Sequence, residues 1–69
     1  MNETKSLGEA IPEQQARVRE LLVFAREIGP AGTFAAMVYE SALRHADRAV
    51  ISGDPVEMIR AFQELKDCR

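Results

Sequence analysis

The 69-residue chain is poor in the residues that most catalytic and metal-binding sites require. It contains one cysteine, Cys68, one histidine, His45, one tyrosine and no tryptophan. A single cysteine excludes a disulfide within the chain, and one cysteine with one histidine cannot supply the four ligands of a structural zinc site. Phosphate-binding glycine motifs, an HExxH motif and paired cysteines are also absent. We therefore expect a protein that is not an enzyme and that uses no cofactor or metal.

Long apolar runs and an excess of positive charge are lacking as well. No segment approaches the length of a membrane span, and the first ten residues, MNETKSLGEA, have no apolar run of an export signal. Nine lysines and arginines against eleven aspartates and glutamates give a net charge of −2. This charge disfavours direct nucleic-acid binding, which depends on neutralising phosphates. These features predict a cytoplasmic protein that binds another protein rather than nucleic acid or a membrane.

The small size of the chain predicts association between copies. A domain of roughly 60 residues buries only ~60% of the surface that its unfolded chain exposes. One core of this size rarely contributes more than about 3–5 kcal/mol of net stability. Because neither a disulfide nor a metal can reinforce the fold, we expect a homodimer.

Apolar periodicity and capping residues predict an all-α fold, a short helical hairpin or three-helix module. Thr33 and Asp54 are predicted helix caps. At the last helix, Pro55 would take the first helical position and Glu57 would complete a capping box with Asp54. No strand alternation or internal repeat is present. The predicted organisation is a disordered tail over residues 1–10 and one helical domain over 11–69, with helices over about 12–28, 34–51 and 55–67.

The middle predicted helix carries a strip of small residues. Its alanines 35, 42, 46 and 49 fall within a sector ~60° wide, and larger apolar side chains flank the strip on both sides. The whole apolar arc covers about half of this helix, which predicts contact from two directions, by the other two helices or by a second chain. The residues expected to pack in the core or at a dimer seam are Ala35, Ala42, Ala46, Ala49, Phe34, Val38, Leu21 and Leu22.

The edge of this arc is the predicted partner surface. Tyr39 ranks first, because tyrosine and arginine combine contact area with a directed polar group at interfaces. The alternative for Tyr39 is ordinary half-buried packing with its hydroxyl at the surface. The full set of expected partner contacts is Tyr39, Arg44, Met37, Leu43, Glu40 and Asp47.

His45 and the last two helices admit other interpretations. His45 lies beside the apolar face, so a hydrogen-bonded position at the edge of the core is the leading interpretation, and a partner contact is the next. A catalytic pair with Ser41 lacks an evident carboxylate to orient the histidine. A DNA-reading helix-turn-helix is disfavoured, because Arg60 and Lys66 are outnumbered by Glu57, Glu64 and Asp67.

The layout of the chain resembles a known group of small proteins. The Leu21-Leu22 pair, the sequence IGPAG, the alanine-rich helix and the sequence SGDPVEMIRAFQELK follow one another over residues 11–68. In this general pattern the chain is similar to early-region proteins of Mu-like Pseudomonas phages, and among them to the quorum-sensing anti-activators. The resemblance implies a small helical dimer that binds a LuxR-type transcriptional activator and blocks its DNA binding. It also implies the type IV pilus assembly ATPase as a second target.

The resemblance also suggests a physical mechanism. An acidic helical dimer would cover the basic DNA-binding surface of the activator, with Glu40 and Asp47 facing its basic residues and Tyr39 packing between them. The alternative is a phage or bacterial structural or regulatory protein that acts by homo-oligomerisation and has no inhibitory target.

Overall fold

The computed structural model describes residues 6–69, and this part of the chain is helical without any strand. The all-α prediction is confirmed. The helical backbone continues unbroken from Leu7 to Ser52 because a 3-10 turn joins its two α-helices, whereas Gly53 and Asp54 separate the final helix. The elements are α1 (Leu7–Ile28), the 3-10 turn η1 (Gly29–Gly32), α2 (Thr33–Ser52) and α3 (Pro55–Asp67).

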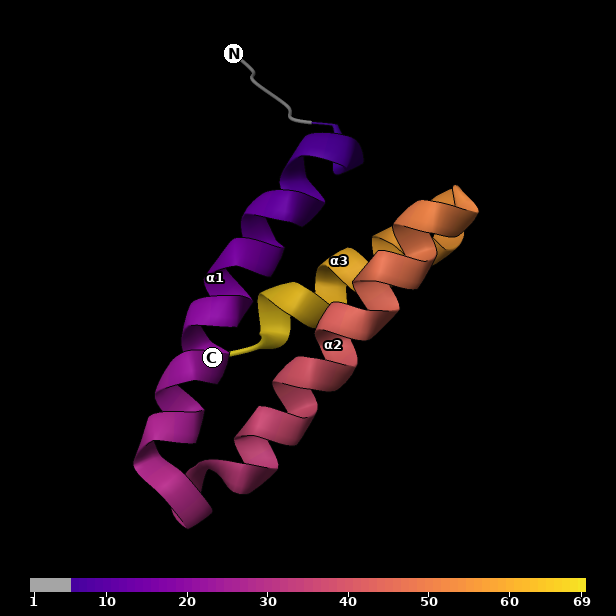
Figure 1. The fold of residues 1–69 in the computed structure, drawn as a ribbon. Coiled ribbons are helices and arrows are strands. Elements are labelled where there is room, and N and C mark those ends of the chain that lie inside the picture. The colour runs from indigo at the N-terminus through magenta and orange to yellow at the C-terminus, as the bar shows by residue number, and fades with distance from the viewer. Residues whose placement is uncertain (1–5) are drawn as a thin grey trace.

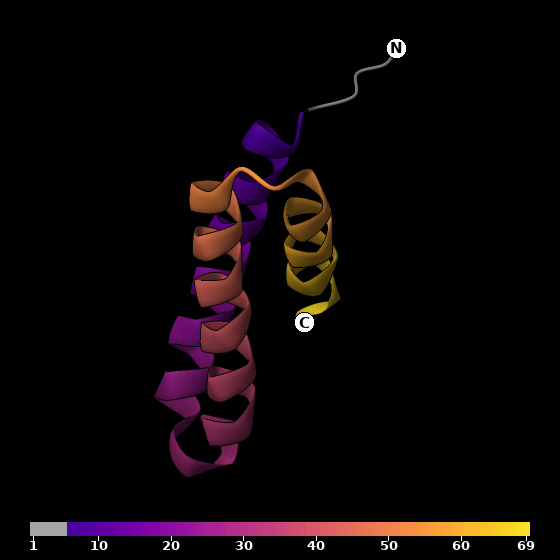
Figure 2. The ribbon, with the colours of Figure 1, turned by 90° about the vertical axis from the view of Figure 1, so that its right-hand side faces the viewer.

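Helices α1 and α2 form an antiparallel hairpin, and η1 is its tip (Figure 1). Helix α3 folds back and contacts both helices of the hairpin. It covers only the half farther from the tip, and the C-terminus lies near the middle of α1 (Figures 1 and 2). The contact from two directions that was predicted for α2 is therefore made by α1 and α3.

Helix α1 begins earlier than the sequence analysis predicted. Residues 7–10, assigned to a tail, are helical, whereas residues 1–5 of that predicted tail lie outside the described residues. Ser6 precedes the helix, and its backbone N–H and hydroxyl both donate to the Glu9 carboxylate, each over 3.3 Å. Pro12 is thus inside the helix rather than at its start. The serine with a glutamate three residues later was the missed start signal.

Two glycines allow the chain to reverse at the tip. Gly29 has φ +85°, a conformation that residues with a Cβ rarely adopt. Gly32 is buried, and a Cβ at this position would lie only 2.0 Å from the backbone oxygen of Ala25. Thr33 is the first residue of α2, and no side chain caps this end, so its predicted capping role is wrong. The helices come together at the tip because Gly32 has no side chain.

The start of α3 follows the predicted cap in part. Asp54 Oδ1 accepts a hydrogen bond of 3.0 Å from the N–H of Val56, and Pro55 takes the first helical position. The Asp54 N–H donates instead to the hydroxyl of Ser52, over 3.1 Å. Glu57 therefore does not close the predicted capping box, and its carboxylate is used elsewhere.

The core contains many small residues. Ala42, Ala46 and Ala49 of the predicted strip are buried, and Ala35 is partly buried against them. Leu22 is buried and Leu21 packs on the core, as expected. Phe34 and Val38 are 78% and 42% exposed, so their assignment to the core of a single chain is wrong. The complete buried hydrophobic set is Ile11, Val18, Leu22, Ala25, Tyr39, Ala42, Ala46, Ala49, Ala61, Leu65 and Cys68.

Candidate functional site

The side of α2 that faces away from both other helices carries an exposed stripe, here called the outer stripe. Met37 and Ile51 are 61% and 85% exposed, and Arg44 and Arg48 lie between them along the helix. Their spacing of seven, four and three residues places all four on one helical face. Neither arginine forms an ion pair with another residue in the part of the chain that the structure describes. The outer stripe therefore combines apolar ends with uncompensated positive charge.

Tyr39 does not belong to this stripe. It is only 8% exposed, and its hydroxyl donates a hydrogen bond to the backbone oxygen of Arg69. The side chain thus ties α2 to the residues that follow α3. Its predicted place as the leading exposed contact is wrong, because the face of α2 that carries Tyr39 is the one covered by neighbouring helices. Leu43 is likewise partly buried and packs against the core.

The two carboxylates that were assigned to a basic partner are engaged within the chain. Glu40 pairs with Arg26 of α1. Asp47 Oδ1 accepts a hydrogen bond of 2.8 Å from Nε2 of Gln15, whose side chain is buried between the helices. Both residues join α2 to α1, which weakens the mechanism in which they face the partner. Of the predicted contacts, Met37 and Arg44 remain exposed and without such a tie.

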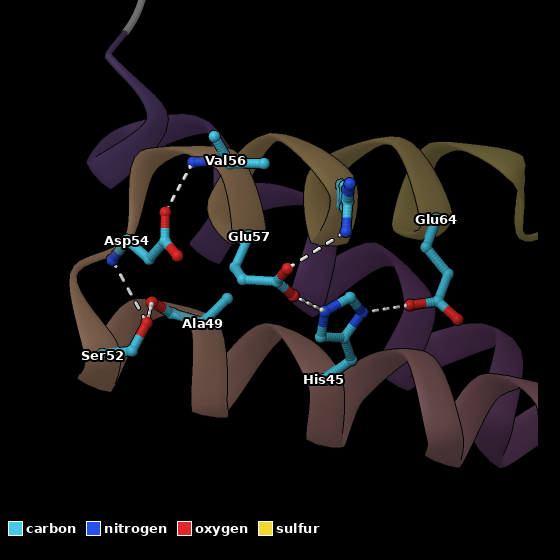
Figure 3. A network of polar contacts seen from close by, with 8 residues as sticks. His45, Ala49, Ser52, Asp54, Val56, Glu57 and Glu64 are labelled. Carbon is cyan, nitrogen blue, oxygen red and sulfur yellow. Dashed lines mark hydrogen bonds and ion pairs between the residues drawn. The ribbon is translucent and has the colours of Figure 1, made fainter.

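A second feature of interest is a polar bracket between α2 and α3 (Figure 3). The ring of His45 lies between two carboxylates of α3, with Nε2 3.0 Å from Glu57 Oε1 and Nδ1 2.8 Å from Glu64 Oε1. Both carboxylates are acceptors when ionised, so the two contacts are satisfied together only when both ring nitrogens carry a proton. The hydrogen bonds with Glu57 and Glu64, in that order, raise the pKa of His45 above its usual value of 6.5.

The bracket settles the position of His45 at the edge of the core, as the leading interpretation predicted. Its side chain is 28% exposed, and both ring nitrogens are occupied by residues of α3. Glu57 also accepts a hydrogen bond from Arg60, over 3.3 Å. Ser41 is exposed and has no part in this network, so the structure does not assemble a Ser41–His45 pair.

The end of α3 is held by an arginine of α1 that the sequence analysis did not single out. Arg17 Nη2 donates to the carbonyl of Leu65 over 2.7 Å, and Nη1 donates to the carbonyl of Cys68 over 2.9 Å. A cation at a helix C-terminus satisfies carbonyls that have no helical partner and interacts favourably with the helix dipole. No local signal could have identified this contact, since the partners are about fifty residues away in the sequence.

Acidic side chains gather on the outer side of α1. Glu20 and Glu27 are exposed and seven residues apart, with Glu13 a further seven residues before them. This spacing places them on one helical face, away from the core residues Val18, Leu22 and Ala25. Within residues 6–69, acidic side chains thus line the outer side of α1, and Arg44 and Arg48 give the outer stripe of α2 a basic character.

The described part of the chain offers no enclosed site for a small molecule. Within residues 6–69 there is no pocket, and no group of three or more histidine, cysteine or acidic side chains is arranged to hold a metal. Cys68 is buried and its thiol lies 3.5 Å from the carbonyl oxygen of Glu64. Burial raises the pKa of this thiol, which disfavours the reactive thiolate.

The stretch Leu7–Ser52 is long and apolar enough to cross a membrane by length and composition alone. The sequence analysis expected no such segment. The stretch is not a single rod, however, because the tip reverses the chain in its middle (Figure 1). Core helices of soluble proteins pass the same criterion, so this property is weak support for a membrane role.

Comparison with known proteins returns no match to a family model, a curated protein or a solved structure. The candidate site therefore rests on the geometry of this chain alone. Its main parts are the outer stripe, the acidic outer side of α1 and the polar ties that hold α3.

Proposed function

We propose that the chain is a non-enzymatic binding protein that captures another protein through the outer stripe of α2. The supporting observation is the exposure of Met37 and Ile51 on either side of Arg44 and Arg48. Arginine and methionine are enriched in protein interfaces, where apolar contact and directed hydrogen bonds act together. A surface site of this kind is consistent with the lack of a pocket in the described residues.

The first partner to test is a LuxR-type quorum-sensing activator, inside the cytoplasm of a bacterial host. This choice rests on the resemblance to phage anti-activators and gives the function as inhibition of the activator's DNA binding. The type IV pilus assembly ATPase is the second partner to test. The pairing of Glu40 and Asp47 with α1 moves the proposed contacts to Met37, Arg44, Arg48 and Ile51.

Purified activator and purified chain provide the test. Titration calorimetry measures their affinity, and a gel shift with operator DNA measures whether the complex releases the DNA. We expect the double variant R44E/R48E to bind at least roughly tenfold more weakly, because each introduced carboxylate would face an acidic group of the partner. The double variant E20K/E27K is the matched control on α1, with two reversed charges outside the proposed contact.

The two variants also identify which activator surface is covered. Weakening by R44E/R48E alone points to an acidic surface of the activator. Weakening by E20K/E27K alone would place the contact on α1 and restore a mechanism that covers the basic DNA-binding surface. Failure of the wild-type chain to bind either the activator or the ATPase would overturn the proposed targets.

A second candidate function is structural or regulatory action by self-association, without an inhibitory target. Its support is a further exposed apolar area near the tip, where Phe34 is 78% exposed. Self-association without any captured host protein, in the same experiments, would favour this alternative.

A further inference from the structure

The surface of the hairpin that holds α3 continues beyond the end of α3. On α1, Arg17 marks this surface because its guanidinium bonds the carbonyls at the end of α3. Phe24 and Ile28 follow Arg17 by seven and eleven residues, which returns both to nearly the same side of the helix. They therefore lie on the α3-facing side of α1, closer to the tip.

Helix α2 repeats this pattern in the opposite direction. His45 marks the side that faces α3, because its ring bonds Glu57 and Glu64. Val38 and Phe34 precede His45 by seven and eleven residues, so they too lie on the α3-facing side and closer to the tip. The two helices thus present four large apolar side chains on one side of the hairpin, here called the distal face: Phe24, Ile28, Phe34 and Val38.

Helix α3 is too short to cover the distal face. Its 13 residues extend for ~20 Å, whereas the 22 residues of α1 extend for ~33 Å. Figure 2 shows α3 beside only the half of the hairpin that is farther from the tip. The exposures are 62% for Phe24, 49% for Ile28, 78% for Phe34 and 42% for Val38.

The buried core of one copy is small compared with the set of large hydrophobic side chains that remain exposed. Five of its buried hydrophobic residues are alanines, and ten large hydrophobic residues are exposed in the described part of the chain. Burial of large side chains provides most of the stability of a small domain, so covering these exposed side chains would add to the modest stability of a lone copy. A second copy of the chain is present wherever the chain is made, and it would cover them with a matching apolar face.

The area of the distal face fits the needs of a small dimer. A fully exposed phenylalanine side chain has an accessible area of ~200 Å². On this scale, the exposed fractions of the four distal-face side chains amount to roughly 400 Å² of apolar surface per copy. Two such faces and their polar rim give about 1,200 Å² if apolar atoms make up ~65% of the interface. This buried area is at the lower end of the range found for specific, stable protein–protein interfaces.

We propose that the distal face is the seam of a homodimer in which two hairpins stack antiparallel. A parallel arrangement would bring the two α3 helices into the same space. In each copy α3 lies on the same side of the hairpin as the distal face, over the half that is farther from the tip (Figure 2). The antiparallel arrangement avoids this collision and points each tip toward the C-terminal end of the other copy's α3. The seam is separate from the outer stripe, so the inference does not depend on which partner that stripe binds.

Sedimentation equilibrium of the purified chain alone tests the seam. We expect the wild type to sediment with twice its chain mass of 7.7 kDa. Phe34→Asp should weaken the dimer roughly 100-fold or more, because two-fold symmetry places the buried charge in the interface twice. Ile51→Asp is the matched control for dimerisation, since Ile51 is 85% exposed on α2, against 78% for Phe34, but lies outside the distal face. It should remain dimeric, and circular dichroism should show both variants to be helical.

Two results would overturn the seam. One is a Phe34→Asp variant that remains dimeric, and the other is a wild-type chain that remains monomeric at millimolar concentration. A monomer that loses its binding to the activator, or to phospholipid vesicles, on Phe34→Asp substitution would assign the distal face to that occupant instead.

A cysteine at the tip tests the arrangement of the two copies. In the antiparallel stack the two tips lie at opposite ends of the seam, too far apart for the Cα separation below ~7 Å that a disulfide needs. The variant Ala31→Cys in a Cys68→Ser background should therefore remain free of dimeric cross-links under mild oxidation. Rapid formation of a disulfide-linked dimer would overturn the antiparallel arrangement.

Discussion

His45 Nδ1 lies 2.8 Å from Glu64 Oε1, and the opposite ring nitrogen of the same histidine lies 3.0 Å from Glu57. Histidine is the side chain whose ordinary pKa is closest to physiological pH. Among the contacts of the described residues, the one that joins the middle of α2 to α3 is therefore the most sensitive to small changes of pH.

The stability contributed by this bracket should decline as the pH rises. The pKa of His45 is raised above 6.5 in the folded chain. The stability contributed by the charged ring is therefore complete below pH 6.5, and it is lost as the pH rises through the higher pKa of the folded state. We expect His45→Gln to lower the free energy of unfolding by about 1 kcal/mol at pH 5.5, the scale of partly exposed ion pairs, and by much less at pH 8.5. Urea denaturation at both pH values measures this difference, and an equal loss at both would contradict the role of the charged ring.

Arg17 should stabilise the C-terminal end of α3. Replacement by methionine keeps much of the aliphatic stem but removes the hydrogen bonds to the carbonyls of Leu65 and Cys68. We expect a loss of about 2 kcal/mol in the free energy of unfolding, the scale of hydrogen bonds with a charged donor. Hydrogen exchange should also become faster in the last turn of α3. Arg19→Met, at an exposed site of the same helix, is the control and should change stability by less than ~0.5 kcal/mol.

Tyr39 should matter for folding rather than for direct contact with a partner. Tyr39→Phe removes only the hydroxyl that bonds the Arg69 carbonyl, with an expected cost of about 1 kcal/mol. Tyr39→Ala removes a buried ring and should cost about 3–5 kcal/mol, enough to unfold much of a small domain. Thermal unfolding followed by circular dichroism gives both values. A stable, fully helical Tyr39→Ala variant that fails to bind a partner would show that the ring has a direct contact role.

Gly32 should be intolerant of any side chain. Gly32→Ala places a Cβ 2.0 Å from a backbone oxygen of α1, and the two helices must separate at the tip to accommodate it. We expect a loss of about 2 kcal/mol, the usual scale of overpacking. Gly8→Ala is the control, because Gly8 lies in α1 and its added Cβ would have only an ordinary contact of 3.7 Å. That control should leave stability unchanged or raise it by about 0.5–1 kcal/mol.

The amino-acid sequence by itself determined the local structure. The apolar spacing of α1, α2 and α3 predicted the all-α class, and Asp54 with Pro55 predicted the start of α3. It also predicted the burial of Ala42, Ala46 and Ala49. These features depend on interactions within a few residues, which a linear pattern records directly. The early start of α1 was recorded in the same way, by Ser6 and Glu9.

The tertiary structure alone decided which side chains are available to a partner. Periodicity places Tyr39 and Phe34 at the edges of one apolar arc, but it does not specify how far along the hairpin α3 extends. The packing buries Tyr39 and leaves Phe34 exposed. It also brings Arg17 to Cys68 and His45 to Glu64, pairs far apart in sequence. The physical reason is that the length and direction of α3 divide one continuous apolar surface into a covered half and an open half.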